Sequence, residues 1–300
     1  MISRTMGPTE WLLLILLSVL WGGSFFFVEV ALAEVPPLTL VLVRVGLAAV
    51  VMTAFVYMRG ERLPGSLTLW GAFLVMGALN NLVPFTLITW GQTQIESGLA
   101  AILIATTPLF TVVLAHRFTG DERMAPNRLA GVAVGLCGVA VLIGPESLSG
   151  LGLYGLGQVA ILGAALSYAG AGVYGRRFQG VPSTVASAAM LVSTTVMMAP
   201  IAIVTESPWT LANPTAITWG AVLGLAVAST ALAYVIYFRI LAVAGATNIL
   251  LVTFLVPVSA VILGTLVLGE RLGWTAFAGM ALISLGLAAV DGRLLAFARR

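Results

Sequence analysis

The chain has 300 residues, of which 60% are hydrophobic and only 8% are charged, and its mean hydropathy is +1.09. A soluble globular domain carries about 25% charged residues, so this composition excludes an ordinary water-soluble fold. The net charge of +3 is small and does not indicate nucleic-acid binding. The single cysteine, Cys137, excludes an intrachain disulfide and a multi-cysteine metal site.

Apolar stretches fill almost the whole chain. A spanning helix needs about 20 mostly apolar residues, because the hydrocarbon core of a bilayer is ~30 Å thick and each helical residue rises ~1.5 Å. The sequence therefore predicts an all-α integral membrane protein with ten transmembrane helices and short loops. We expect the first span to be retained, since it is too long for a signal peptide. The predicted spans are Trp11–Val30, Leu38–Met58, Leu67–Trp90, Ser97–Arg117, Asn127–Ile143, Leu153–Tyr174, Ser183–Val204, Ala216–Arg239, Thr247–Leu268 and Trp274–Val290.

Arginines determine the predicted orientation, because the chain contains no lysine. If the N-terminus is cytoplasmic, every arginine near a loop except Arg271 falls on the inner side. The loop glutamates Glu34, Glu96, Glu146, Glu206 and Glu270 then fall outside. Positive charge is concentrated in cytoplasmic loops. We therefore predict that both termini are cytoplasmic.

The second half of the chain repeats the pattern of the first. The clearest match is between Ser97–Ile143 and Ala246–Val290. Pro108 aligns with Pro257, Glu122-Arg123 with Glu270-Arg271, and Gly131 with Gly279. Each repeat, residues 1–146 and 147–300, holds five predicted spans, and an odd number requires the two halves to cross the membrane in opposite senses. Inverted repeats of this kind are typical of alternating-access carriers that hold substrate near the bilayer midplane.

Several motifs are similar to a known family. They are Leu20-Trp21-Gly22-Gly23-Ser24, Val35-Pro36-Pro37 followed by Arg44, and the helix–Pro–helix–Gly-Glu-Arg–helix units. Over its whole length the chain resembles the drug/metabolite transporter superfamily, EamA type, and most resembles the bacterial aromatic amino acid exporters of the YddG type. The resemblance implies ten helices around a central cavity and export of amino acids and related metabolites across the bacterial inner membrane. It also implies that the first, third, fourth, sixth, eighth and ninth spans line the path.

Polar side chains near the middle of these spans are the candidate substrate-binding residues, because polar groups at membrane depth tend to face the bundle interior or a wet cavity. Asparagine, threonine, tyrosine and tryptophan suit a neutral or zwitterionic substrate. Other roles stay open: the asparagines as interhelical hydrogen bonds, the tryptophan as packing, and the threonines as donors to their own helix. The candidates are Trp21, Ser24, Asn80, Asn81, Thr106, Thr107, Tyr168, Tyr234 and Thr253.

Four further residues are candidates for conformational change or coupling. Pro108 and Pro257 each interrupt the backbone hydrogen bonds of a span, so they are either paired gating hinges or static kinks. Glu29 and Arg44 lie on consecutive helices, where they would form an ion pair or Glu29 would couple transport to protons. A fifth feature, the glycine face that begins at Gly131, would pack against another helix of the chain or form a dimer seam.

The residue pattern argues against an enzyme. The mid-membrane regions hold no cluster of His, Asp, Glu or Cys for a metal, and the single histidine, His116, lies at a helix end. We expect no cofactor or metal, and no P-loop occurs. The expected function is that of a secondary exporter of aromatic and other neutral amino acids. One alternative is a proton-coupled exporter of cationic drugs or other metabolites. Another is a channel or facilitator. Expected partners are the substrate and membrane lipid but no nucleic acid, for a monomer or weak homodimer.

Overall fold

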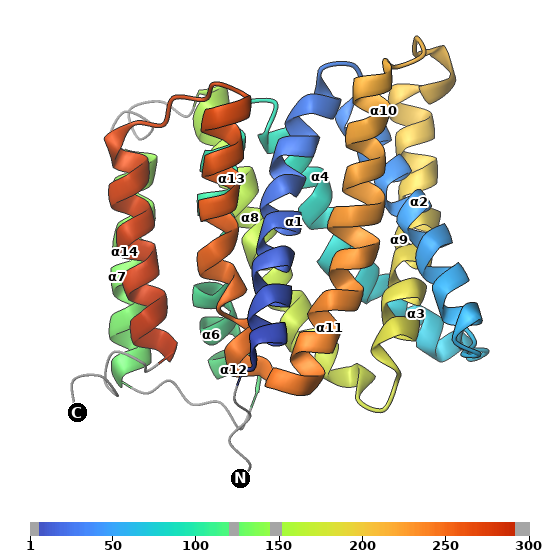
Figure 1. The fold of residues 1–300 in the computed structure, drawn as a ribbon, viewed down its shortest axis with the longest axis horizontal. Helices are drawn as coiled ribbons and strands as arrows, with labels where there is room; N and C mark the ends of the chain where they lie inside the picture. Colours follow the sequence, from blue (N-terminus) through green and yellow to red (C-terminus); the bar gives the residue numbers. More distant parts are fainter. Residues whose placement is uncertain (1–5, 120–125, 145–151, 292–300) are drawn as a thin grey trace.

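The computed structural model describes residues 6–119, 126–144 and 152–291, and over these residues all regular structure is helical. Long helices run side by side in one bundle, and α1 begins at the end of the bundle where α14 ends (Figure 1). The predicted Glu122-Arg123 signature and the boundary between residues 146 and 147 lie outside the described residues.

Seven helical stretches are long and apolar enough to cross a membrane. They are Pro8–Leu32, Pro37–Met58, Leu67–Gly91, Ser97–Phe118, Leu153–Phe178, Ser183–Glu206 and Ala216–Ala244. The other three predicted spans are shorter apolar helices, Arg128–Ile143, Val252–Val267 and Trp274–Val290. The ninth predicted span is shortened because the chain leaves the helical conformation at Leu250–Leu251. The prediction of all-α structure is confirmed for the described residues.

Six of the predicted spans are each a single helix in the described residues, and the four longest are α1 (Pro8–Leu32), α2 (Pro37–Met58), α8 (Leu153–Tyr174) and α9 (Ser183–Glu206). The third and eighth predicted spans each contain a π-helical segment. The third is α3 (Leu67–Gly77), the π-helix η1 (Ala78–Leu82) and α4 (Val83–Gly91); the eighth is α10 (Ala216–Leu223), the π-helix η5 (Gly224–Leu232) and α11 (Ala233–Ala244). Such π-helical insertions are rare and occur often at functional sites.

The fourth and ninth predicted spans are each broken into two helices. They are α5 (Ser97–Ile104) with α6 (Thr107–Phe118), and α12 (Ala246–Ile249) with α13 (Val252–Val267). The remaining helices are α7 (Pro126–Ile143), α14 (Trp274–Asp291) and the short 3₁₀ turns η3 (Gly175–Phe178) and η4 (Pro208–Thr210).

Glycines bring α7 and α14 into backbone contact at one edge of the bundle (Figure 1). A Cβ on Gly138 would lie 2.8 Å from the Ile283 nitrogen, and one on Gly286 would lie 2.6 Å from the Gly131 oxygen. Because the start of α7 meets the end of α14, the two helices are antiparallel. The glycine face is therefore packed within the chain, and its alternative role as a dimer seam is not supported.

Carboxylates at both ends of the α2–α9 pair hold these helices together. Glu206, at the end of α9, accepts hydrogen bonds from the Leu38 and Thr39 amides in the first turn of α2, at 3.0 and 2.7 Å. At the other end, Glu61 accepts a hydrogen bond from the Thr184 hydroxyl at 2.6 Å, in the first turn of α9. Anionic groups are favoured at helix N-termini, where amides lack intrahelical acceptors.

Two more glutamates bind the starts of helices from elsewhere in the chain. Glu270 accepts hydrogen bonds from the Ser97 amide at 2.8 Å and the Gly98 amide at 3.0 Å, at the start of α5. Glu34 accepts one from the Thr215 amide at 2.7 Å, just before α10, and this bond lowers the pKa of the exposed Glu34 carboxyl below its usual value. The loops thus fix the relative positions of helices distant in sequence.

Two large apolar clusters form the interior. One is made mainly by α1, α5, α7, α8, α11, α13 and α14, and the other mainly by α2 and α9. We call them the large cluster and the second cluster. Tyr168, on α8, packs against both. The boundary between the clusters is therefore where a polar site would be shielded from lipid on both sides.

Candidate functional site

Two asparagines of the π-helix η1 and a tyrosine of α11 form a hydrogen-bond network inside the bundle. The Tyr234 hydroxyl donates to the Asn81 side-chain oxygen at 2.9 Å, and the Asn80 amide donates to the Tyr234 hydroxyl at 3.1 Å. The Asn81 amide in turn donates to the Thr194 hydroxyl of α9 at 3.2 Å. We call Asn80, Asn81, Tyr234 and Thr194 the central network. It joins η1, α9 and α11.

The two asparagines have different environments. Asn81 has no exposed surface and bonds both α9 and α11, as expected for an interhelical contact. Asn80 is half-buried. Its amide nitrogen also lies 3.3 Å from the Asn81 oxygen. The two adjacent asparagines therefore differ: Asn81 is enclosed between helices, whereas Asn80 keeps some exposed surface.

Arg44 places a positive charge near this network. Its side chain is only 6% exposed, and its Nε donates to the Thr230 hydroxyl of η5 at 3.0 Å. The guanidinium carbon lies 3.6 Å from the centre of the Phe85 ring, so the cation stacks on an aromatic face. Thr230 itself donates to the Leu225 carbonyl five residues earlier, which the π-helical geometry brings within 2.8 Å.

The ion pair considered between Glu29 and Arg44 does not form. Among the described residues, the salt bridge present is Arg59–Glu61, at 3.7 Å on the surface. Glu29 instead lies 3.4 Å from the Gln92 amide, which also donates to the Phe25 carbonyl at 2.9 Å. Gln92 thus holds Glu29 near the end of α1, while Arg44 turns toward η5 and Phe85.

Trp21 and Ser24 lie on the face of α1 that packs toward α11. The Trp21 ring centre is 5.5 Å from that of Tyr237, and the tryptophan is packed against the large cluster. Ser24 donates to the Trp21 carbonyl at 2.6 Å, within its own helix. These contacts place aromatic surface one helical turn from Tyr234.

The three candidate threonines are bonded to their own helices. Thr106, Thr107 and Thr253 each donate to the carbonyl three residues earlier, at 2.6 to 2.7 Å. Thr106 is also completely buried. Their hydroxyls are therefore engaged locally, which fits the alternative of backbone bonding better than direct substrate contact.

The two prolines occupy different structural positions. Pro108 lies in the first turn of α6, directly after the break between α5 and α6, where a missing amide costs little. Pro257 lies inside α13 and is buried, whereas the break in that span occurs earlier, at Leu250–Leu251. Both spans therefore break, but only the break between α5 and α6 adjoins its proline.

Several contributors were not singled out from the sequence. Thr194 and Thr230 supply hydroxyls to the central network and to Arg44, and Phe85 supplies the ring beneath the guanidinium. Both threonines lie deep in apolar spans, which is the signal that identified the other candidates. Phe85 carries no such signal, because only the packing of α2 against α4 brings it under Arg44.

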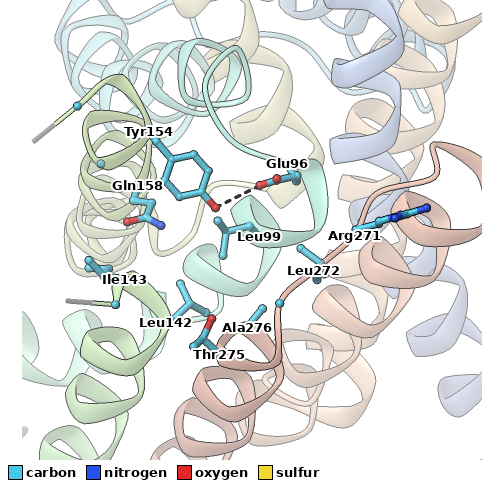
Figure 2. A pocket seen from close by; sticks show the side chains of 14 residues that line it. Glu96, Leu99, Leu142, Ile143, Tyr154, Gln158, Arg271, Leu272, Thr275 and Ala276 are labelled. Carbon is cyan, nitrogen blue, oxygen red and sulfur yellow. Dashed lines mark hydrogen bonds between the residues drawn. The ribbon is translucent and has the colours of Figure 1, made fainter. Parts of the chain in front are cut away.

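A separate cavity of about 490 Å³ lies at one end of the bundle, near the end of α7 and the starts of α8 and α14 (Figure 2). In its lining, the Tyr154 hydroxyl points toward the Glu96 carboxylate and donates a hydrogen bond to it at 3.3 Å. None of the predicted site residues lines this cavity. A second cavity, of about 350 Å³, lies between α2 and α9 and is mostly apolar.

Comparison with known proteins identifies the family. Residues 9–144 and 155–290 each match the EamA-like transporter family. The chain is 33% identical over 261 residues to the inner membrane transporter YedA of Escherichia coli (strain K12), covering 85% of this chain and 82% of the relative. It is 29% identical over 291 residues to a probable amino-acid metabolite efflux pump of the same organism, covering 94% of each chain.

A solved crystal structure shares the fold. Its TM-score is 0.70 at 23% sequence identity, over 99% of this chain and 100% of that one. Together with the apolar helices long enough to cross a bilayer, these matches describe a multi-pass inner membrane protein built from two repeats. This chain belongs to the EamA-like transporter family of the drug/metabolite transporter superfamily.

Proposed function

We propose that this chain is a secondary transporter that exports aromatic and other neutral amino acids, and related metabolites, across the bacterial inner membrane by alternating access. The observation that carries the proposal is the central network, whose Tyr234 packs against the second cluster. It offers amide and hydroxyl groups beside aromatic rings, in a region where polar groups are costly unless they serve a site. The name of the efflux-pump relative agrees with this substrate class.

Ten spans arranged as two inverted repeats are part of the proposal. Helix contacts support them, because each helix packs on the other half in the way its counterpart does. In the first half α1 packs on α13 and η5 of the second, and its counterpart α8 packs on α6 and η1 of the first. The α2–α9 and α7–α14 pairs each join corresponding helices, and the carboxylate contacts of Glu206 and Glu61 recur at opposite ends. This exchange is the pattern that an internal two-fold axis produces.

Alternating access requires elements that adjust without unfolding. The π-helices η1 and η5 and the breaks in the fourth and ninth spans are such elements, and two of them carry the central network or its neighbours. We infer that Pro108 keeps the α5–α6 break open and that movement about these breaks exposes the network to each side in turn. Both termini are cytoplasmic in this account.

A cation near the site argues against the alternative cargo. A cationic drug would require a carboxylate in the binding region, but the buried charge beside the central network is the guanidinium of Arg44. Glu29 is held by Gln92 near the end of α1 instead. The residues therefore favour neutral or zwitterionic cargo over cationic cargo.

Uptake into proteoliposomes tests the proposal. We expect the purified chain to take up labelled tryptophan and threonine, with a rate that saturates and is inhibited by unlabelled amino acid. Empty liposomes are the control. No saturable uptake of any neutral amino acid, with or without a pH gradient, would contradict the assigned cargo.

A further inference from the structure

Arg44 carries a buried charge that no carboxylate of the described residues neutralises. Its side chain is only 6% exposed, and it forms no salt bridge within the described part of the chain. A charge inside a membrane protein is normally paired, or it faces the path of a substrate or ion. The guanidinium is held here by one hydroxyl and one aromatic ring, which fix its position without cancelling its charge.

The contacts of Arg44 leave one edge of its guanidinium unused. Thr230 occupies Nε, and Phe85 covers a face of the planar group. The two terminal nitrogens form no hydrogen bond with the described residues. They also keep some exposed surface, so they are not sealed inside the bundle. This fork of N–H groups matches the two oxygens of a carboxylate.

The neighbours of this edge are polar but uncharged. Tyr168 and Tyr234 lie within electrostatic range of Arg44, and Tyr234 belongs to the central network. The Tyr168 hydroxyl also has no hydrogen-bond partner among the described residues and is not fully enclosed. The guanidinium therefore combines an unbonded cationic edge with an aromatic ring and nearby neutral hydroxyls, an arrangement suited to a small acid with an apolar or aromatic side chain.

We propose that Arg44 is the carboxylate anchor of the transport site, and that it makes the protein selective for amino acids and other small carboxylic acids over their amides and amines. This inference rests on the proposed function, of which it specifies the cargo. Thr230 and Phe85 are positioning residues, which hold the guanidinium plane so that its terminal nitrogens meet the carboxylate.

The test is binding of radiolabelled tryptophan to the full chain in detergent, with unlabelled competitors. Indole-3-propionate keeps the carboxylate and lacks the ammonium group, whereas tryptamine and tryptophanamide keep the ammonium group and lack the carboxylate. We expect indole-3-propionate to displace tryptophan at least about tenfold better than tryptamine or tryptophanamide does, because a charge-assisted bidentate contact is lost in the latter two. Equal displacement by tryptamine would overturn the proposal.

Variants show whether the carboxylate preference comes from Arg44 itself or from the positive charge of the protein as a whole. Arg44→Gln should lower tryptophan affinity at least about tenfold and abolish the preference for indole-3-propionate, and Arg44→Lys should restore part of that preference. Arg239→Gln, at an exposed position of α11, is the matched control and should bind as the native chain does. A carboxylate preference that persists in a folded Arg44→Gln protein would overturn the proposal.

Two measurements keep the proposal testable if Arg44→Gln does not fold or if tryptophan is not a ligand. Thr230→Val removes the hydroxyl that holds Nε and should weaken the carboxylate preference without changing charge. Thermal unfolding of the native chain should also shift upward with phenylalanine, tryptophan or threonine, but not with their amides, since a ligand of the folded state raises Tm. No carboxylate-dependent shift across this panel would overturn the proposal.

Transport assays distinguish this proposal from the proposed function. Equal saturable uptake of tryptophan and tryptophanamide would leave an exporter standing and overturn the carboxylate anchor. Carboxylate-selective binding without uptake would support the anchor and contradict the exporter.

Discussion

The α7–α14 pair and the central network are both places where helices from the two halves meet, but their chemistry is opposite. In the α7–α14 pair, glycines bring backbone against backbone, and a Cβ on Gly138 or Gly286 would lie 2.6 to 2.8 Å from the other helix. In the central network, the helices are joined by amide and hydroxyl groups of Asn80, Asn81 and Tyr234.

This difference separates a fixed contact from an exchangeable one. Backbone packing has no spare hydrogen-bonding groups and no room for a ligand, so it stabilises one arrangement of the two helices. Side-chain hydrogen bonds in a polar network can be exchanged for bonds to a substrate at small net cost. We therefore expect substitutions in the first region to change folding and those in the second to change transport.

The largest effect is expected at Gly286. Leucine there would place a Cβ 2.6 Å from the Gly131 oxygen and the Gly135 nitrogen, so α7 and α14 would have to separate. We expect a loss of about 3 kcal/mol or more and little monodisperse protein on size exclusion. Gly220→Leu is the matched control, because no atom lies within 4 Å of the added Cβ. Native yield and Tm for Gly286→Leu would contradict the tight pairing.

A smaller effect on folding and a larger one on transport are expected for Asn81→Leu. The substitution leaves the Tyr234 and Thr194 hydroxyls without their asparagine partner, at a cost of about 1–3 kcal/mol. Tryptophan uptake should fall at least about tenfold in kcat/KM, since Asn80 and Tyr234 lose their alignment. Thr195→Val, whose hydroxyl bonds the Leu191 carbonyl of its own helix, should transport normally. Native kcat/KM for a folded Asn81→Leu protein would show that the network is only packing.

A third prediction concerns the polar contact between Glu270 and the start of α5, which we expect to affect stability. Glu270→Ala removes the carboxylate that accepts from the Ser97 and Gly98 amides at the start of α5, and we expect a loss of about 1 kcal/mol in thermal unfolding. Glu270→Gln keeps an acceptor and should lose less. The neighbouring exposed Arg271→Gln should leave stability unchanged. Equal stability of all three variants would mean that the cap does not stabilise α5.

The smallest effect is expected for Glu29→Gln. Glu29 contacts Gln92 and does not pair with Arg44, so the substitution should change tryptophan uptake less than about twofold. The measurement is uptake into proteoliposomes with and without an inward pH gradient. Gradient-driven uptake that the substitution abolishes would instead make Glu29 a proton-coupling residue.

Apolar length predicts the helices well, because each span must satisfy its own backbone hydrogen bonds in lipid. The asparagine pair was also predictable, since amides are rare at that depth. Three features were not. The π-helical segments, in one of which Thr230 bonds the Leu225 carbonyl five residues earlier, have no signature in the apolar pattern, and the Phe85 stacking depends on tertiary packing. The break in the ninth span precedes Pro257, so the proline alone did not locate it.

The accessibility of position 80 shows whether the central network is exposed alternately to the two sides of the membrane. Cys137 is the single cysteine, so Cys137→Ala provides a background for Asn80→Cys, and Val196→Cys on the outer surface of α9 is the control. The account predicts that a membrane-impermeant maleimide modifies position 80 from either side of oriented vesicles, that tryptophan slows this reaction, and that position 196 is unaffected. Modification from one side only, without protection by substrate, would contradict it.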